Sequence, residues 1–466
     1  MKDKTSETQS LVTFRNSQGV EARGTLMNLT RNQAVFEVYN PYSLVQLSEV
    51  LSDFKIMRRG RTVYSGRAVA SNLVATGLML IVSATLVDPW SDLTGLQPGE
   101  GLREEVESFI SDWETDYQLR DGYQLAVTNI SAFLSELNRW LQEFVLMSGV
   151  GEEDEEAAQR AREVAAELMD PLVPKMKNLF GHFEEAAEQI PPEETVPHKA
   201  FAQRELHPLL LCSPFIYRTF TKPLGYAGDY EMVNMILRDP LQGPNTYARI
   251  MNVFTLQRAP AEAHRNRIEM LFEILRTEAE KAAAENRQLN ILNVGCGPAA
   301  EVERFVRSDS LSERCSIELL DFNRETLDYA RDVLHKAARE SDSKPDLNYV
   351  HRSIHHLLKQ SARRDATPEP QYDLVYCAGL FDYLSDRICE RLVELFYAWT
   401  NPGGLLVTTN VHTNNPIRYY MEYLLEWHLN YRDEVDLLEM APQGSTPRVY
   451  TDSTGVNVFL EIKKSD

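Results

Sequence analysis

The stretch LNILNVGCGPAAEVERF (Leu289–Phe305) joins an apolar run to a glycine pair and then to a helix-like segment. The apolar run ends at Val294, and Gly295 and Gly297 follow it directly. A strand, a tight glycine turn and a helix in this order are typical of a nucleotide-type cofactor site in a doubly wound α/β sheet. The stretch also fits the dinucleotide pattern G-x-G-x-x-G/A, so the neighbouring residues must decide between NAD and another cofactor.

Charges around the glycine turn argue against a dinucleotide. Glu301 and Glu303 lie in the first turn of the expected helix, where a pyrophosphate needs free N–H groups and a positive dipole end. Pro298 removes one of those N–H groups. S-adenosyl-L-methionine carries no phosphate and has a cationic sulfur, so an acidic rim suits it. Asp321, at the tip of the next expected strand, can accept both ribose hydroxyls in either cofactor.

The end of the chain distinguishes the two cofactors. The motifs LNVGCGPA and ELLDFN are followed by YDLVYCAGLFDYL, by NPGGLL and by a final expected hairpin, PRVYTDSTGVNVFLEIKK. Together they resemble the class I S-adenosylmethionine-dependent methyltransferase fold over about residues 286–466. The resemblance implies a Rossmann-like α/β domain with a seven-stranded sheet. Ala299 departs from it, because the family usually has a third glycine there, and so does Asn293, where an acid is common.

The resemblance implies a set of cofactor-binding residues at the ends of the expected strands. The residues His351–Ile354 would border the adenine, and Ala378–Leu380 would lie beside the methionine moiety. The full set is Gly295, Cys296, Gly297, Asp321, Phe322, Ser353, Ile354, Ala378, Gly379 and Leu380. The histidines have no carboxylate or cysteine partner at metal-ligand spacing, so no metal is predicted.

A second motif precedes this fold. KPLGYAGDYEMVN, together with AGLFDYLSD, resembles a bacterial methyltransferase family labelled for extracellular factor 3-hydroxypalmitic acid methyl ester biosynthesis, over about residues 195–466. This resemblance implies methyl transfer to the carboxylate of a 3-hydroxy fatty acid, which gives a methyl ester signal of the quorum-sensing type. A methyltransferase of a protein side chain is the alternative enzyme. A signalling adaptor with a vestigial methyltransferase fold is the alternative from another class.

The glycine-rich turn of that motif supplies two candidate catalytic residues. Tyr226 and Asp229 stand on the turn and are expected to reach into the cleft, and Asp382 is the third candidate. Replacing Tyr226 by Phe or Asp229 by Ala is expected to lower turnover by at least about tenfold, with a nearly unchanged melting temperature. A capped loop between helices, with no role in the reaction, is the simpler alternative.

Methyl transfer to a carboxylate needs no general base, because a carboxylic acid is already ionised at neutral pH. An amine or hydroxyl acceptor would need one. The candidate bases are Asp229, Asp382, His264 and His412. The candidate partners of an acceptor carboxylate are Arg265, Arg267 and Asn410.

Residues 414–435, NNPIRYYMEYLLEWHLNYRDEV, read as a helix that is aromatic on most of its faces. Such a helix would either line an acyl tunnel or pack against the helical insertion. The aromatic residues are Tyr419, Tyr420, Tyr423, Trp427 and Tyr431.

The N-terminal part reads as a small β-barrel over 10–90, followed by helices over 100–190 and a helical insertion or cap over 195–285. MNLTRNQAVFEV resembles the second signature of the PilZ domain, but Gln33 stands where glycine should be. The first signature, an arginine pair, is missing, since Arg15 and Arg23 are too far apart. We expect a degenerate PilZ-like barrel that does not bind cyclic di-GMP in the usual way.

The charge and cysteine content limit the classes of partner that the protein is expected to bind. The chain has 48 basic and 69 acidic residues, for a formal net charge of -21, and such a surface repels nucleic acids. The five cysteines form no CxxC motif, and neither a signal peptide nor a membrane span is recognisable. We therefore expect a cytoplasmic protein with a small-molecule acceptor. Its oligomeric state is left open.

Overall fold

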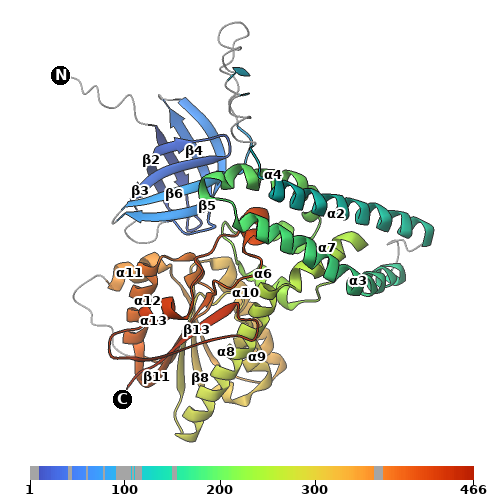
Figure 1. Cartoon of the computed structure of the whole chain (residues 1–466). Coiled ribbons are helices and arrows are strands. Elements are labelled where there is room, and N and C mark those ends of the chain that lie inside the picture. Colours follow the sequence, from blue (N-terminus) through green and yellow to red (C-terminus); the bar gives the residue numbers. More distant parts are fainter. Residues whose placement is uncertain are drawn as a thin grey trace, which may run out of the picture.

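The computed structural model describes residues 10–39, 45–58, 61–76, 79–90, 106–107, 110, 118–148, 155–361 and 371–465. Figure 1 shows a small barrel, a group of helices and a mixed sheet with its own helices. The barrel and the sheet lie on the same side of the two long helices α2 (Asp121–Ser148) and α3 (Glu155–Glu188). The expected fold class, a barrel followed by helices and a seven-stranded α/β sheet, is confirmed.

The barrel is closed by six antiparallel strands in the order β1-β2-β3-β6-β5-β4. Phe14, Phe36 and Phe54 point inward, and their ring centroids lie 5.5–6.3 Å apart. Closure removes the exposed edges that short strands would otherwise present. The strands are β1 (Leu11–Arg15), β2 (Glu21–Leu29), β3 (Gln33–Tyr39), β4 (Val50–Arg58), β5 (Arg61–Thr76) and β6 (Met79–Leu86).

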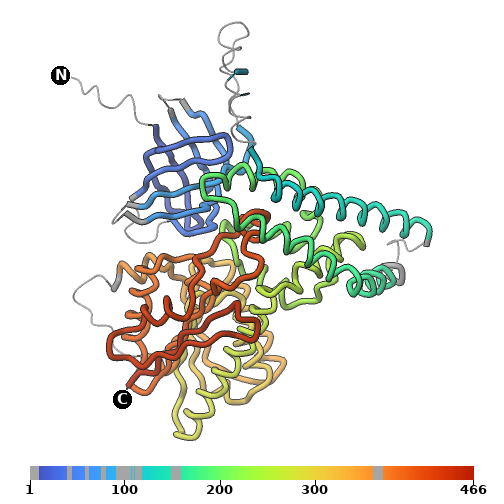
Figure 2. Tube along the Cα trace, in the orientation of Figure 1, coloured from blue at the N-terminus to red at the C-terminus, as the bar shows by residue number. Residues whose placement is uncertain are grey.

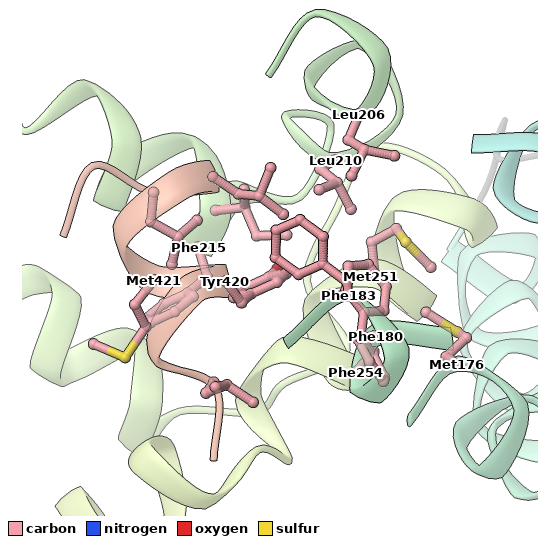
Figure 3. Close-up of a cluster of buried hydrophobic side chains, with 14 of the residues drawn as sticks. Met176, Phe180, Phe183, Leu206, Leu210, Phe215, Met251, Phe254, Tyr420 and Met421 are labelled. Atoms are coloured by element: carbon pink, nitrogen blue, oxygen red, sulfur yellow. The ribbon is translucent and has the colours of Figure 1, made fainter. Parts of the chain in front are cut away.

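The central helices share one apolar core, which Figure 3 shows in close-up. Phe180 of α3 contacts Phe254 and Tyr420, with ring centroids 5.4 Å apart in both pairs. Most of the predicted helical residues 100–117 lie outside the described part of the chain. The other helices here are η1 (Pro192–Glu194), α4 (Thr195–Leu210), α5 (Pro214–Thr221), α6 (Tyr230–Leu237), α7 (Thr246–Leu256) and α8 (Ala259–Ala284). No described helix is long and apolar enough to cross a membrane.

The C-terminal sheet has the order β12-β13-β11-β10-β7-β8-β9. Strands β7 to β11 run parallel, and β13 is antiparallel to both β11 and β12. The predicted closing hairpin is thus present. The strands are β7 (Leu289–Val294), β8 (Cys315–Asp321), β9 (Asp346–His351), β10 (Tyr372–Cys377), β11 (Thr400–Val411), β12 (Thr446–Thr451) and β13 (Asn457–Lys463).

The helices around this sheet leave its carboxyl edge open between β7 and β10, where ligands bind in such sheets. Chain order reverses there, because β7 pairs with β8 on one side and with β10 on the other. The helices are α9 (Ala300–Ser308), η2 (Ser310–Arg314), α10 (Arg324–Glu340), α11 (Ile354–Ser361), η3 (Phe381–Tyr383), α12 (Asp386–Trp399) and α13 (Glu434–Glu439).

The expected aromatic helix over residues 414–435 is wrong. The segment contains one short π-helix, η4 (Tyr420–Leu424), which Figure 2 shows in red against the green helices. The Glu184 carboxylate of α3 accepts the N–H groups of Tyr419 and Tyr420. Glu426 has a φ of 50° and pairs with the buried Lys199 at 2.9 Å. These contacts with distant helices override the local helical pattern.

Candidate functional site

A large cavity opens at the carboxyl edge of the sheet, between β7, β8, β10 and helix α8. It has two ends of different character. One end is lined by the loops that follow the parallel strands, and these residues include Gly295, Cys296, Gly297, Asp321, Phe322, Ile354, Ala378, Gly379 and Leu380. The other end is mainly apolar and includes Phe215, Val233, Ile236, Ile417, Tyr420, Met421, Leu425, Trp427, Leu429 and Val456. We call these two ends the glycine lobe and the apolar lobe.

The glycine turn after β7 needs its glycines for backbone geometry. Gly295 and Gly297 have φ values of 69° and 52°, in the region that side chains disfavour. No atom lies within 4 Å of the place where a Gly297 Cβ would stand, so the backbone is open to a ligand. Ala299 also has a positive φ, 53°, which explains why a glycine would be favoured at this position.

Asp321 lies at the tip of β8, where the sequence predicts it. Its Oδ2 accepts the Gly297 N–H at 3.2 Å, and its Oδ1 accepts the Asn323 N–H at 2.9 Å. Burial raises the pKa of this carboxyl from 3.8 to about 6, although these hydrogen bonds lower it. The carboxylate therefore faces the cavity from a fixed position and titrates close to neutral pH.

This shift predicts a pH-dependent affinity for S-adenosylhomocysteine. A ribose diol donates its hydroxyls to the ionised carboxylate. With a pKa of about 6, the ionised fraction of Asp321 falls from about nine-tenths at pH 7 to about one-tenth at pH 5. Calorimetry should therefore show an affinity about tenfold lower at pH 5. Asp321→Asn should bind weakly at both values, and an unchanged pH dependence in this variant would contradict the assignment.

A second carboxylate lines the glycine lobe. The Oε1 atom of the buried Glu301 accepts hydrogen bonds from the Asn293 amide at 3.0 Å and from the Tyr376 hydroxyl at 2.9 Å. Glu303, by contrast, pairs with Arg307 at 2.9 Å and does not line the cavity. The acidic rim expected from the sequence thus consists of Glu301. This residue supplies a carboxylate beside Asn293, where the resemblance leads one to expect an acid.

Arg267 of α8 brings a buried positive charge to the same lobe, near the carboxylates of Asp382 and Glu301. Its side chain is buried, and its Nη1 atom has no hydrogen-bond partner among the described residues. Nη1 lies 3.0 Å from the place where a Cβ on Gly379 would stand. A buried guanidinium N–H that bonds to nothing is costly. Arg267 and Glu301 together offer partners for a carboxylate and an ammonium, the two charged groups of a methionyl moiety.

The structure brings most of the predicted site residues together, but not Asp229 or Ser353. Asp229 is the N-cap of α6: it accepts the Met232 N–H at 2.8 Å and pairs with Nε and Nη2 of Arg218 at 3.0 and 2.9 Å. The expectation that its carboxylate reaches into the cleft is wrong. Ser353 accepts the His356 N–H at the start of α11.

The other two candidate catalytic residues do line the cavity. The ring of Tyr226 packs on Phe322, with centroids 4.9 Å apart, and its hydroxyl lies 3.4 Å from that of Thr326. This position covers the end of the site next to Asp321. The Asp382 carboxylate accepts the Val411 N–H at 2.6 Å, and burial raises its pKa to about 6.

Two of the four candidate bases, Asp382 and His264, line the cavity. The His264 Nδ1 lies 2.9 Å from the carbonyl of Pro260, and burial lowers its pKa to about 3, so the imidazole is a weak proton acceptor. His412 instead pairs with Glu434, at 3.0 Å.

Of the predicted carboxylate partners, Arg267 reaches the cavity. Arg265 donates to the carbonyls of Ile236 and Leu256, and Asn410 is held by Arg432 at 2.6 Å.

The sequence did not single out Arg258, which is the cation of the apolar lobe. Its guanidinium stacks on Phe254 at 5.1 Å, and no described residue forms a hydrogen bond with it. Thr255 and Tyr420, whose hydroxyl oxygens lie 3.1 Å apart, line the same part of the cavity. Burial lowers the pKa of Arg258. A helix N-cap arginine carries no sequence signal for such a role.

Two further cavity residues are linked by a hydrogen bond. Trp427 donates its indole N–H to the Tyr383 hydroxyl at 3.0 Å. This bond joins the loop after β10 to the segment after η4 and so closes one wall of the cavity. The described residues contain no group of three or more His, Cys, Asp or Glu side chains that could hold a metal.

Comparisons with known proteins give solved structures of low similarity. No family model and no curated protein sequence matches the chain. A Bordetella parapertussis structure, described as a possible exported protein, is 17% identical with a TM-score of 0.42, over 54% of this chain and 86% of that one. Magnesium protoporphyrin IX methyltransferase from Synechocystis, solved with bound S-adenosylhomocysteine, is 12% identical with a TM-score of 0.36, over 57% and 99%. N-methyltransferase NodS from Bradyrhizobium japonicum is 15% identical with a TM-score of 0.28, over 42% and 88%.

Proposed function

We propose that the chain binds S-adenosyl-L-methionine in the glycine lobe and transfers its methyl group to the carboxylate of an acyl molecule in the apolar lobe. A 3-hydroxy fatty acid fits the resemblance of the sequence motifs best. The observation that carries the proposal is the pair formed by Arg267 of α8 and Arg258, the N-cap residue of this helix. Arg267 lies beside the glycine turn, whereas Arg258 lies in the apolar lobe. Arg258 precedes Arg267 by nine residues, which separates their backbones by about 13 Å along the helix axis, at about 1.5 Å per residue.

The cofactor assignment uses the charged groups of the glycine lobe, of which Arg267 has an Nη1 atom without a hydrogen-bond partner among the described residues. We assign Asp321 to the ribose hydroxyls, Glu301 to the ammonium and Arg267 to the carboxylate of the methionyl group. Phe322 and Ile354 border the adenine, and the Gly295–Gly297 backbone lies along the cofactor. Tyr226 covers the adenosine end through its contact with Phe322. When bound, S-adenosyl-L-methionine supplies an electrophilic methyl group on a cationic sulfur.

The acceptor assignment follows from the chemistry of the apolar lobe. Its aromatic and aliphatic walls suit an acyl chain, and Arg258 is the cation that we assign to the acceptor carboxylate. A carboxylate oxygen forms the new bond to the methyl carbon, the bond from that carbon to sulfur breaks, and its electron pair stays on sulfur. No proton moves, so the reaction does not need a general base, and the weak basicity of His264 does not affect it. Asp382 is assigned to fixing β11 and the nearby Arg267 rather than to proton transfer.

The substrate class can be tested with labelled cofactor. The full-length chain is incubated with methyl-labelled S-adenosyl-L-methionine and a bacterial lysate, which is then separated into lipid-extractable and protein fractions. We expect the label in the lipid extract, because the segment Leu425–Leu429 and the turn Tyr226–Gly228 line the cavity and restrict the access of a large acceptor. Label confined to protein would replace this proposal by methylation of a protein side chain. An adaptor without activity would transfer no label.

A further inference from the structure

Two residues of the N-terminal barrel line the same cavity as the cofactor-binding loops. They are Gln46 and Leu47, which lie between β3 and β4 and are 9% and 7% exposed. They are far in sequence from every other lining residue. The barrel is therefore part of the site wall.

Hydrogen bonds fix this segment both to the barrel and to the C-terminal part of the chain. The Glu49 carboxylate accepts the N–H groups of Ser17 and Gln46, both at 2.8 Å. The Ser48 hydroxyl donates to the carbonyl of His428 at 2.8 Å and accepts the N–H of the same residue. Leu47 and Gln46 thus lie directly beside the Leu425–Leu429 wall of the apolar lobe.

A second set of contacts joins the barrel to the glycine-rich turn. The Val50 N–H donates to the carbonyl of Gly225 at 2.6 Å. Ser17 lies next to the same glycine, since its Cβ is 3.4 Å from the place where a Gly225 Cβ would stand. The turn continues into Tyr226, Ala227 and Gly228, which line the cavity. The barrel segment thus lies between the glycine-rich turn, which covers the adenosine end, and the Leu425–Leu429 wall of the apolar lobe.

The Gln46 side chain brings an unused polar group to this place. Its residue is 9% exposed, and none of the described side chains or main-chain groups bonds to its amide. An amide both donates and accepts, as a hydroxyl does, so the two groups form matched hydrogen bonds. An acyl ligand that fills the lobe would exclude water from this amide, and a ligand hydroxyl would replace the lost hydrogen bonds.

We propose that the barrel segment Val45–Glu49 is the acceptor-selectivity element of the site, in which Gln46 hydrogen-bonds the hydroxyl of a hydroxy-acyl acceptor and Leu47 borders its chain. This inference rests on the proposed acyl substrate and deepens it. It gives the barrel a direct role in substrate recognition that needs no cyclic dinucleotide.

Binding of acceptor probes to the full-length chain tests this role. Calorimetry with S-adenosylhomocysteine present compares 3-hydroxy fatty acids with unsubstituted fatty acids of the same length. The unmodified chain should prefer the hydroxy acid by at least about tenfold. Gln46→Leu should bind both alike, and Gln46→Met repeats the test if that variant does not fold. Gln18→Leu changes a half-buried glutamine of the same barrel that does not line the cavity, and it should keep the preference.

Leu47→Trp provides a second, independent readout. The larger side chain should shorten the longest chain that binds, whereas Leu26→Trp, on the barrel away from the cavity, should not. Affinity for S-adenosylhomocysteine serves as the folding control in every variant. A Gln46→Leu variant that folds and keeps the preference overturns the inference, as does an unmodified chain without any preference. Selective binding without methyl transfer would instead leave the inference standing and refute the proposed reaction.

Discussion

Arg267→Met lowers the affinity for S-adenosylhomocysteine by about 30- to 1,000-fold, which is about 2–4 kcal/mol for a lost ion pair with the ligand carboxylate. The melting temperature of the ligand-free chain changes little, because Nη1 of Arg267 forms no hydrogen bond in the described structure. Calorimetry and thermal melting measure the two effects on the same sample. Binding is thus weakened without unfolding, as expected for a side chain that bonds to the ligand and not to the rest of the chain.

Arg265→Met is the matched control on the same helix. Arg265 donates to the carbonyls of Ile236 and Leu256, so this variant loses stability while the folded fraction keeps its affinity within about threefold. If Arg267→Met binds S-adenosylhomocysteine as tightly as the unmodified chain, the assignment of Arg267 to the methionyl carboxylate is wrong.

Asp229→Ala destabilises the chain by about 2–4 kcal/mol. The change removes the N-cap of α6 and leaves Arg218 without its partner, and both losses are costly at a buried position. Thermal melting should show a clear drop, while the affinity of the folded chain for S-adenosylhomocysteine stays nearly constant. This reverses the expectation from sequence, in which turnover fell and stability did not.

Asp229→Asn separates the two contributions. Asparagine caps helices as well as aspartate does, so this variant loses only the charge pair with Arg218 and should be less destabilised than Asp229→Ala. A variant with unchanged melting and a specific loss of turnover would show that Asp229 acts on the substrate after all.

Local signals explain what the sequence predicts correctly. The glycine pair, the strand ending at Asp321 and the closing hairpin depend on residues close together in the chain, so periodicity and turn chemistry reveal them. The barrel is predicted for the same reason, from short strands separated by turns.

Contacts between distant segments explain what the sequence does not predict. The segment around η4 is non-helical because Glu184 and Lys199, from α3 and α4, hold its backbone and Glu426. Asp229 is drawn to Arg218 by an ion pair that the turn motif does not reveal. Gln46 reaches the cavity only because the barrel docks against the glycine-rich turn. None of these partners has a fixed spacing in the sequence.

The most direct test of the proposed reaction is the alkali lability of the product. The purified chain is incubated with methyl-labelled S-adenosyl-L-methionine and a 3-hydroxy fatty acid, and the organic extract is treated with mild alkali. A methyl ester hydrolyses and releases its label as volatile methanol, which the account predicts for the extracted product. Label that stays in the extract after alkali, as in a methyl ether or methylamine, or the absence of extractable label, would contradict carboxyl methylation.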